Sequence, residues 1–270
     1  PELDKYGCLR ALSLDLRGAP PTLDELAALD RSADVPASIV DAYLASEDFV
    51  GQVVRRHRDL LWNNLSNADL LNFQAFFSVD YSSGQPLYFR PTPARLYRGS
   101  DVPCDPVPAT IRSGVIAYRV DGQGYRREGY LEVRPYWAPD APIRVCAFDA
   151  QAAQFTSQGT DCATLDAYGD PQCGCGPDLR WCATYDRYQE LLRSFAREVE
   201  VRVAEVVRGD RPYTELFTGT TAFVNGPMVH YYRHQARLPG QLDLTPLPLS
   251  VDRLPDLPWT QSSFVPIALP

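Results

Sequence analysis

The sequence is poor in lysine, methionine and histidine, and it has no long apolar run. Lysine occurs only as Lys5, so arginine carries almost all of the positive charge of the 270-residue chain. The basic residues are scattered among acidic ones and the net charge is −8, whereas proteins that bind phosphate backbones usually present clustered basic residues. Nucleic acid is therefore not expected as a partner. Because the apolar runs are short, no transmembrane segment is expected either.

The sequence also lacks the short motifs of common catalytic and cofactor sites. It contains no G-x-S-x-G nucleophile elbow, no P-loop and no G-x-G-x-x-G dinucleotide motif. The C-x-x-C-H pattern that attaches haem covalently is absent as well. The absence of these motifs means that the sequence identifies no reaction. Whether the chain is an enzyme is therefore left open, and its cofactor is unknown.

The composition nevertheless indicates a folded protein, since 45% of the residues are hydrophobic and 22% are charged. The chain begins at Pro1, and Met228 is its single methionine, so we expect a processed product or a piece of a longer protein. Removal of a secretory signal would account for such a start.

Four of the seven cysteines, Cys162, Cys173, Cys175 and Cys182, lie close together in a segment rich in glycine, aspartate and proline. Such a segment has little apolar material to hold its shape, so disulfides are expected. Two local bridges are predicted, in which Cys173 and Cys175 each pair with a different partner. A four-thiolate zinc site is one alternative, and an iron–sulfur or redox-active role is another.

Residues 1–80 are predicted to form a helical module that begins with extended backbone ending at Pro20-Pro21. Thr22 and Glu25 have the spacing of a capping box, in which both side chains cap the first turn of a helix. The expected helices cover residues 23–29, residues 36–45, a segment capped by Ser46 with Phe49, Val53, Leu60 and Leu61 on its apolar face, and residues 68–77.

Residues 81–182 are predicted to be an inserted β-rich region that ends in the cysteine loop. Residues 115–120, Tyr130–Val133 and residues 143–148 are rich in β-branched and aromatic side chains, and the turn signal Asp121-Gly122-Gln123-Gly124 separates the first two. They predict a small antiparallel sheet, with Cys104 and Cys146 at its two ends as a long-range bridge. Cys8 is left over, either as a thiol or with a partner outside the chain.

Residues 183–236 are predicted to form a second helical module that packs on the first. Apolar residues recur at three- and four-residue steps, and Gly209 ends the helix that they predict. These residues are Tyr188, Leu191, Leu192, Phe195, Val199, Val203 and Val206. Short helices are expected at residues 213–217 and 227–234, and residues 237–270, with seven prolines, are expected to form an extended strap. The predicted fold class is α+β, a mostly helical body with an inserted sheet and a disulfide-rich loop.

Histidines are the first candidates for chemistry. His57 stands among arginines on a predicted helix, where cationic neighbours would lower its pKa, and a structural role is favoured over that of a general base. His230 and His234 are four residues apart and would share one helix face. Two histidines at this spacing can bind one metal ion. Met228 adds a soft ligand that would suit copper or a haem iron. Packing of an aromatic helix is the alternative for this group.

Aspartates are the second candidates. Asp161, Asp166, Asp170 and Asp178 are crowded into the cysteine loop, where calcium could bridge them. Solvated loop carboxylates are the alternative.

Two stretches of the chain resemble modules of a known group of proteins. Residues 10–62 contain "LDLRGAPPT" and "YLASEDF", and residues 207–234 read "VRGDRPYTELFTGTTAFVNGPMVHYYRH". They resemble helical modules of unknown function in large cell-envelope proteins of planctomycetes and myxobacteria. The resemblance implies an envelope or secreted location and association with cytochrome c modules, although this chain lacks the haem motif.

Taken together, these features predict an acidic bacterial protein that is secreted, periplasmic or on the outer cell surface. Its expected role is binding, assembly or assistance in electron transfer, with another protein or the remainder of a longer polypeptide as partner. One alternative is an extracellular hydrolase or redox enzyme that acts on polymers. Another is a haem- or copper-binding protein that uses His230, His234 and Met228.

Overall fold

The computed structural model describes residues 4–61, 68–92, 95, 99, 102–167, 169–242 and 249–269. Within these residues the chain is an α+β protein with three disulfides, as the sequence predicts. The chain divides into two compact units. Unit 1 comprises Pro1–Asn64, Ala196–Phe223 and Ala268–Pro270, and unit 2 comprises Leu65–Phe195 and Val224–Ile267. Unlike the four predicted segments, each unit is therefore assembled from separate parts of the chain.

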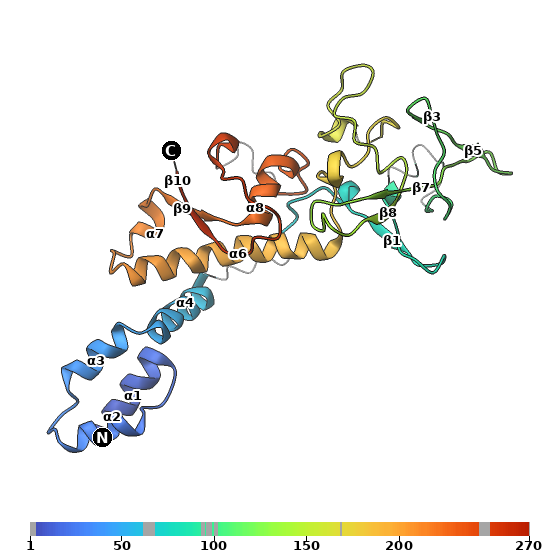
Figure 1. Cartoon of the computed structure of the whole chain (residues 1–270). Coiled ribbons are helices and arrows are strands. Elements are labelled where there is room, and N and C mark those ends of the chain that lie inside the picture. The colour runs from blue at the N-terminus through green and yellow to red at the C-terminus, as the bar shows by residue number, and fades with distance from the viewer. Residues whose placement is uncertain are drawn as a thin grey trace. The chain divides into compact units, whose positions relative to one another are not determined.

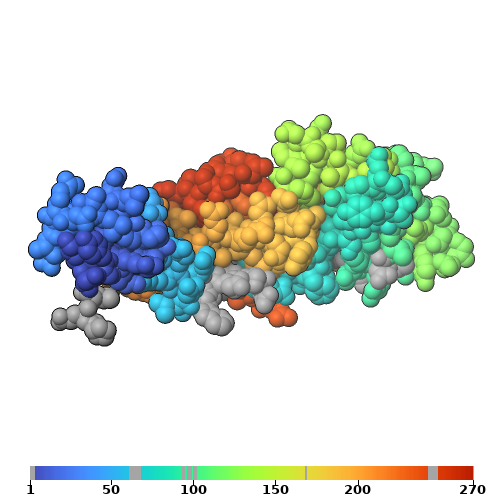
Figure 2. Space-filling view, turned by 90° about the horizontal axis from the view of Figure 1, so that it is seen from below, coloured from blue at the N-terminus to red at the C-terminus, as the bar shows by residue number. Residues whose placement is uncertain are grey.

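Unit 1 contains four helices from the first part of the chain, whose side chains gather in the blue body of Figure 2. They are α1 (Lys5–Arg17), α2 (Leu23–Asp30), α3 (Ala37–Leu44) and α4 (Glu47–Leu61), which Figure 1 shows in sequence. Leu9, Leu29 and Tyr43 form the buried core between the first three helices. Both hydrogen bonds of the predicted capping box between Thr22 and Glu25 are present, at 2.7 and 3.3 Å.

Two expectations for this region were wrong. The backbone before Pro20 is helical rather than extended, because Asp4 caps α1 by accepting a hydrogen bond from the Gly7 N–H, and Gly18 ends it in the left-handed conformation with φ 73°. On α4 the predicted apolar face is also shifted. Leu60 is 80% exposed whereas His57 is only 7% exposed, because Val53 and Val54 set the buried face.

The longest helix, α6 (Tyr185–Arg208), is the helix that the apolar repeat predicts. Its residues up to Phe195 belong to unit 2 and the remainder to unit 1. Gly209 follows its last turn, where Arg208 forms ion pairs with Glu47 and Glu205 at 2.8 and 3.0 Å. A short helix, α7 (Glu215–Thr218), comes next at the predicted place.

A four-stranded sheet forms the centre of unit 2 in the order β1-β2-β8-β7. Its strands are β1 (Ser78–Asp80), β2 (Leu87–Phe89), β7 (Tyr130–Val133) and β8 (Ile143–Cys146). Pairs β1–β2 and β7–β8 are antiparallel, while β2 and β8 run parallel because a long crossover connects them. Two further hairpins pair β3 (Ile111–Arg112) with β4 (Val115–Ile116) and β5 (Arg119–Val120) with β6 (Arg126–Arg127), so the strand predicted at residues 115–120 is divided.

Residues 68–77, predicted to be helical, contain only the 3-10 turn η1 (Phe73–Ala75). The reason is a tertiary contact with the segment around Ala183. The Ala183 N–H donates to the Ala75 carbonyl and the Phe77 N–H donates to the Ala183 carbonyl, at 3.1 and 3.0 Å, so this backbone is bonded outside its own segment.

The last part of the chain contains β9 (Thr221–Val224), α8 (Gly226–His230), a π-helical turn η4 (Tyr231–Gln235), the 3-10 turn η5 (Val251–Arg253) and β10 (Val265–Ala268). The helix predicted at residues 227–234 is thus present, in two geometries. Residues 243–248 of the predicted strap lie outside the described residues. In the part of the chain that the structure describes, no helix has the length and apolarity needed to span a membrane.

All three disulfides lie in unit 2. They join Cys104 to Cys146, Cys162 to Cys173 and Cys175 to Cys182. Cys173 and Cys175 therefore take different partners, as predicted, and the zinc and iron–sulfur alternatives for these four cysteines are wrong. Cys8, which is half-buried on α1, takes part in none of the three bridges.

A buried ion pair lies beside the bridges. Asp149 accepts hydrogen bonds from the Arg90 backbone N–H at 3.1 Å and from Arg90 Nε at 3.0 Å, and both side chains are almost fully buried. Arg90 also donates to the Cys173 carbonyl at 3.2 Å, so it connects the end of β2 to the cysteine loop.

Candidate functional site

A pocket of about 240 Å³ in unit 2 brings together residues that are far apart in the sequence. We call it the His234 pocket, and its main lining residues are Phe155, Asp161, Arg180, Trp181, His234 and Arg237. One side comes from the cysteine loop, and the other comes from η4 and the residues that follow it. The pocket therefore combines aromatic walls with two cations, one anion and an imidazole.

The cysteine loop is shaped locally before it reaches the pocket. Phe155 and Asp161 form an isolated antiparallel bridge, and the disulfide from Cys162 to Cys173 closes the loop. Gly176 adopts φ 76° and lies so close to Trp181 that a Cβ atom there would come within 2.6 Å of the indole ring. A residue with a side chain would therefore displace Trp181 from the pocket wall.

The other wall begins with a well-capped helix. Asn225 caps α8 by accepting a hydrogen bond from the Met228 N–H at 3.3 Å, and its own amide donates to Ser194 Oγ at 3.0 Å. The helix then widens into η4, where the Ala236 N–H donates to the Tyr231 carbonyl at 2.9 Å. Single π-helical turns occur frequently at functional sites, because they change the direction of the side chains that follow.

His230 has a structural role at the base of this wall. Its Nε2 donates to the Arg180 carbonyl at 3.0 Å, and its ring stacks on Tyr136 with centroids 3.7 Å apart. Trp259 contacts the same ring edge to face at 5.4 Å. Burial, followed by the neighbouring His234, lowers the pKa of His230 to about 3, so the ring is neutral at physiological pH.

His234 lines the pocket itself and is half-buried. Its ring lies 5.0 Å from that of His230, and neither of its nitrogens forms a hydrogen bond with any residue that the structure describes. Burial, together with the charges of Arg180 and Arg233, lowers the pKa of His234 to about 4. At neutral pH the pocket thus contains an uncharged imidazole with one donor and one acceptor.

The two arginines of the pocket are each held by a single carboxylate. Arg237 Nη1 lies 2.8 Å from Asp161 Oδ2, and the other oxygen of Asp161 accepts from the Ala163 N–H at 2.9 Å. Arg180 donates through Nε to the Pro177 carbonyl and through Nη2 to Asp178, at 3.0 and 3.3 Å. A guanidinium has five donors, so each arginine keeps donors for a further anion.

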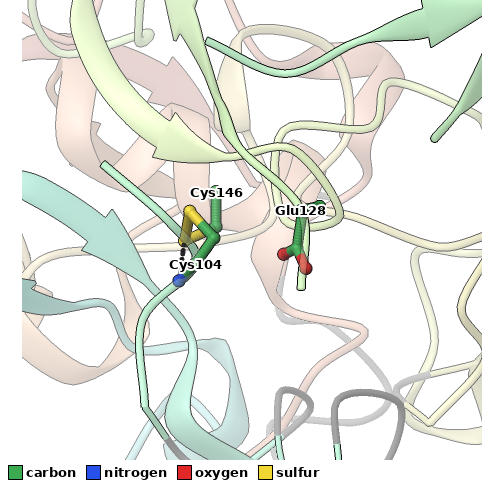
Figure 3. A group of neighbouring side chains, drawn as sticks. All are labelled: Cys104, Glu128 and Cys146. Carbon is green, nitrogen blue, oxygen red and sulfur yellow. Dashed lines mark hydrogen bonds between the residues drawn. A yellow bond between two sulfur atoms is a disulfide. The ribbon is translucent and has the colours of Figure 1, made fainter. Parts of the chain in front are cut away.

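The geometry gives little support to a metal site at His230, His234 and Met228. His230 uses Nε2 for the Arg180 carbonyl, and Met228 is 3% exposed. Among the described residues, no group of three potential His, Cys, Asp or Glu ligands includes either histidine. The group that does meet this criterion is Cys104, Glu128 and Cys146, but Figure 3 shows its two sulfur atoms joined in a disulfide.

The aspartates of the cysteine loop are likewise used locally. Asp161 accepts from the Ala163 N–H, Asp170 accepts from the Gln172 N–H at 2.8 Å, and Asp178 pairs with Arg180. In the part of the chain that the structure describes, no three of these carboxylates gather around one point, so the geometry does not support the calcium hypothesis.

His57 lies in unit 1, beside a pocket of about 180 Å³ that Glu198 and Arg202 also line. Its Nδ1 is 3.2 Å from the Tyr213 hydroxyl. Its pKa is lowered, as the sequence predicts, but the cause is burial and not the neighbouring arginines. Glu198 is held by Arg202 at 2.7 Å, so it does not orient the imidazole.

Comparisons with known proteins add no relative, because no family model, no curated protein and no solved structure matches the chain. The His234 pocket therefore has to be interpreted from its own geometry. Arg180 and Arg237 were not singled out from the sequence, although Arg237 follows His234 at a three-residue step. That three-residue spacing is the one feature of the sequence that places Arg237 near His234.

Proposed function

We propose that this chain is an extracytoplasmic binding protein whose His234 pocket holds the carboxylate group of a small ligand. The compartment is supported by the three disulfides, which persist in oxidising environments and are rare in the cytosol. The resemblance of residues 10–62 and 207–234 to envelope modules supports the same compartment. A ligand-binding role within a larger envelope assembly would be consistent with it.

The observation that carries the proposal is the position of two guanidinium groups beside an imidazole without hydrogen-bonded partners among the described residues. Arginine recognises carboxylates through paired N–H donors, and charge-assisted hydrogen bonds of this kind are about twice as strong as neutral ones. The neutral His234 ring can donate one further hydrogen bond to the same group. Asp161 keeps Arg237 in place, so the site exists before the ligand arrives.

The same features favour binding over catalysis. A general base works best when its pKa lies near the working pH, whereas the pKa of His234 is lowered to about 4. The carboxylate in the pocket, Asp161, is bonded to Arg237 and to the Ala163 N–H and does not orient the imidazole. The alternative of an extracellular hydrolase is therefore the weaker one.

The test uses the fact that the chain has three histidines, so their ring signals can be followed individually by NMR. Titration with acetate is expected to raise the pKa of His234 from about 4, because a bound anion stabilises the imidazolium. His57 lies in the other unit and serves as an internal reference.

Two variants make the test specific. R237Q and R180Q are each expected to weaken acetate binding about tenfold, the loss typical of one charge-assisted hydrogen bond. R119Q is the matched control, because Arg119 has the same exposure as Arg237 (59% and 60%) and is also paired with an aspartate. A His234 signal that does not respond to acetate, or that responds equally in R237Q, would refute the proposal.

A further inference from the structure

A second pocket in unit 2, of about 380 Å³, lies along the same stretch of the cysteine loop. Its walls are largely apolar and include Val115, Ile116, Tyr118, Phe148, Phe155 and Pro171. We call it the apolar pocket. Tyr118 lies under the guanidinium of Arg126, 4.9 Å from the ring centroid, so this wall is also held in place.

The apolar pocket has a preformed floor. The side-chain amide of Gln151 donates to the Phe148 carbonyl at 2.9 Å and to the Pro171 carbonyl at 2.8 Å, which ties two of its walls together. Gln172 accepts a hydrogen bond from the Ser157 N–H at 2.8 Å. A pocket whose shape exists in the free protein binds without the entropy cost of ordering its walls.

Phe155 lines both the apolar pocket and the His234 pocket. Phe155 is 60% exposed, so its ring is available to contact an apolar group of a ligand. Phe155 is bridged to Asp161, the residue that holds Arg237. One short segment therefore connects an apolar surface to a cationic one.

The volumes of the two pockets also indicate that a ligand would extend into the apolar pocket. Pockets for small molecules usually measure about 300–1,000 Å³. The His234 pocket, at about 240 Å³, is below that range, whereas the apolar pocket, at about 380 Å³, lies within it and has room for an apolar group.

We infer that the ligand is an amphiphilic carboxylate, with its acid group between Arg180 and Arg237 and its apolar, ring-bearing part against Phe155 in the apolar pocket. This inference rests on the proposed function and adds the class of ligand to it. The acid supplies the charge that the arginines complement. The ring covers apolar side chains that are otherwise in contact with water.

The experiment compares acetate with phenylacetate, 4-phenylbutyrate and 6-phenylhexanoate, using calorimetry and the His234 NMR signal. At least one phenyl acid is expected to bind ten times or more tighter than acetate, because burial of a ring adds apolar contact. F155A is expected to weaken binding of that acid more than binding of acetate, because the ring lies against Phe155 whereas acetate is held by the two arginines. Y81A is the matched control, since Tyr81 is 69% exposed in unit 2 and lines neither pocket.

A second variant covers the case in which F155A does not fold, as judged by circular dichroism. V115E places a negative charge on an exposed strand position in the apolar pocket and is expected to weaken the phenyl acids but not acetate. Phenyl acids that bind no tighter than acetate would overturn the inference and leave the proposed function standing. If no carboxylate shifts His234, both are overturned.

Discussion

Unit 1 is stabilised by helices of 8 to 15 residues that enclose Leu9, Leu29 and Tyr43, and none of the three disulfides lies in it. Unit 2 has all three disulfides, and the strands of its sheet and hairpins are only two to four residues long. The two units therefore depend on different stabilising interactions. Where regular elements are long, apolar faces and caps are sufficient, and where they are short, covalent bridges and a buried ion pair stabilise the fold. The His234 pocket and the apolar pocket both lie in unit 2, the unit with the disulfides.

The largest effect is expected from removal of the bridge with the longest loop. Cys104 and Cys146 are separated by 42 residues, so the double variant C104A/C146A should lose about 4 kcal/mol through the greater entropy of its unfolded chain. Urea unfolding followed by tryptophan fluorescence in a W62F background reports on unit 2, because Trp137, Trp181 and Trp259 belong to unit 2 and Trp62 belongs to unit 1. The control is C8S on α1. Equal losses in the two variants would contradict the comparison.

Loss of the buried ion pair should come next. D149N leaves the guanidinium of Arg90 buried beside an uncharged group, which typically costs about 3 kcal/mol. D256N is the control, because Asp256 pairs with Arg233 but is 98% exposed, so its loss should leave the unfolding midpoint nearly unchanged. Similar unfolding midpoints for the two variants would mean that the Arg90 pair does not hold the cysteine loop.

Acidification should weaken unit 2 through His230. The pKa of this histidine in the folded state, about 3, is below its ordinary value of 6.5, so its stabilising effect is complete above pH 6.5 and is lost as the pH falls towards 3. Between pH 7 and pH 5 His230 should lower the free energy of unfolding by about 2 kcal/mol. H230F should remove this contribution and leave that of His234, whose pKa is also lowered, to about 4. A variant that keeps the full pH slope would assign the slope to other groups.

The smallest effect is expected in unit 1. T22A removes the hydroxyl that caps α2 and should cost about 1 kcal/mol, whereas T22S should restore most of it. Helix unfolding measured by circular dichroism should report the loss, and the tryptophan fluorescence of unit 2, measured in the W62F background, should not. A fluorescence transition that shifts with T22A would show that the two units unfold together.

Features that depend on neighbouring residues were predicted from the sequence. The capping box of Thr22 and Glu25, the apolar repeat of α6 and the pairing of Cys173 and Cys175 with different partners all follow from local spacing. Each of them depends on periodicity, on capping or on loops too short to pair otherwise.

Among the features that depend on distant residues, the bridge between Cys104 and Cys146 was predicted, but others were not. Residues 68–77 were predicted to be helical, but hydrogen bonds with Ala183 hold them in another conformation. On α4, Leu60 was predicted to be buried, but His57 is buried and Leu60 is exposed. The His234 pocket combines Asp161, Arg180 and Arg237, which separate segments bring together. Neither periodicity nor a motif encodes such a meeting, because it depends on how the cysteine loop folds back.

The most direct test of the account is a map of the disulfides in protein purified from its native host. The protein would be alkylated without reduction, digested, and its peptides identified by mass spectrometry. The account predicts three linked pairs, Cys104–Cys146, Cys162–Cys173 and Cys175–Cys182. Alkylation of all seven cysteines, or a linkage of Cys162 to Cys182, would contradict it.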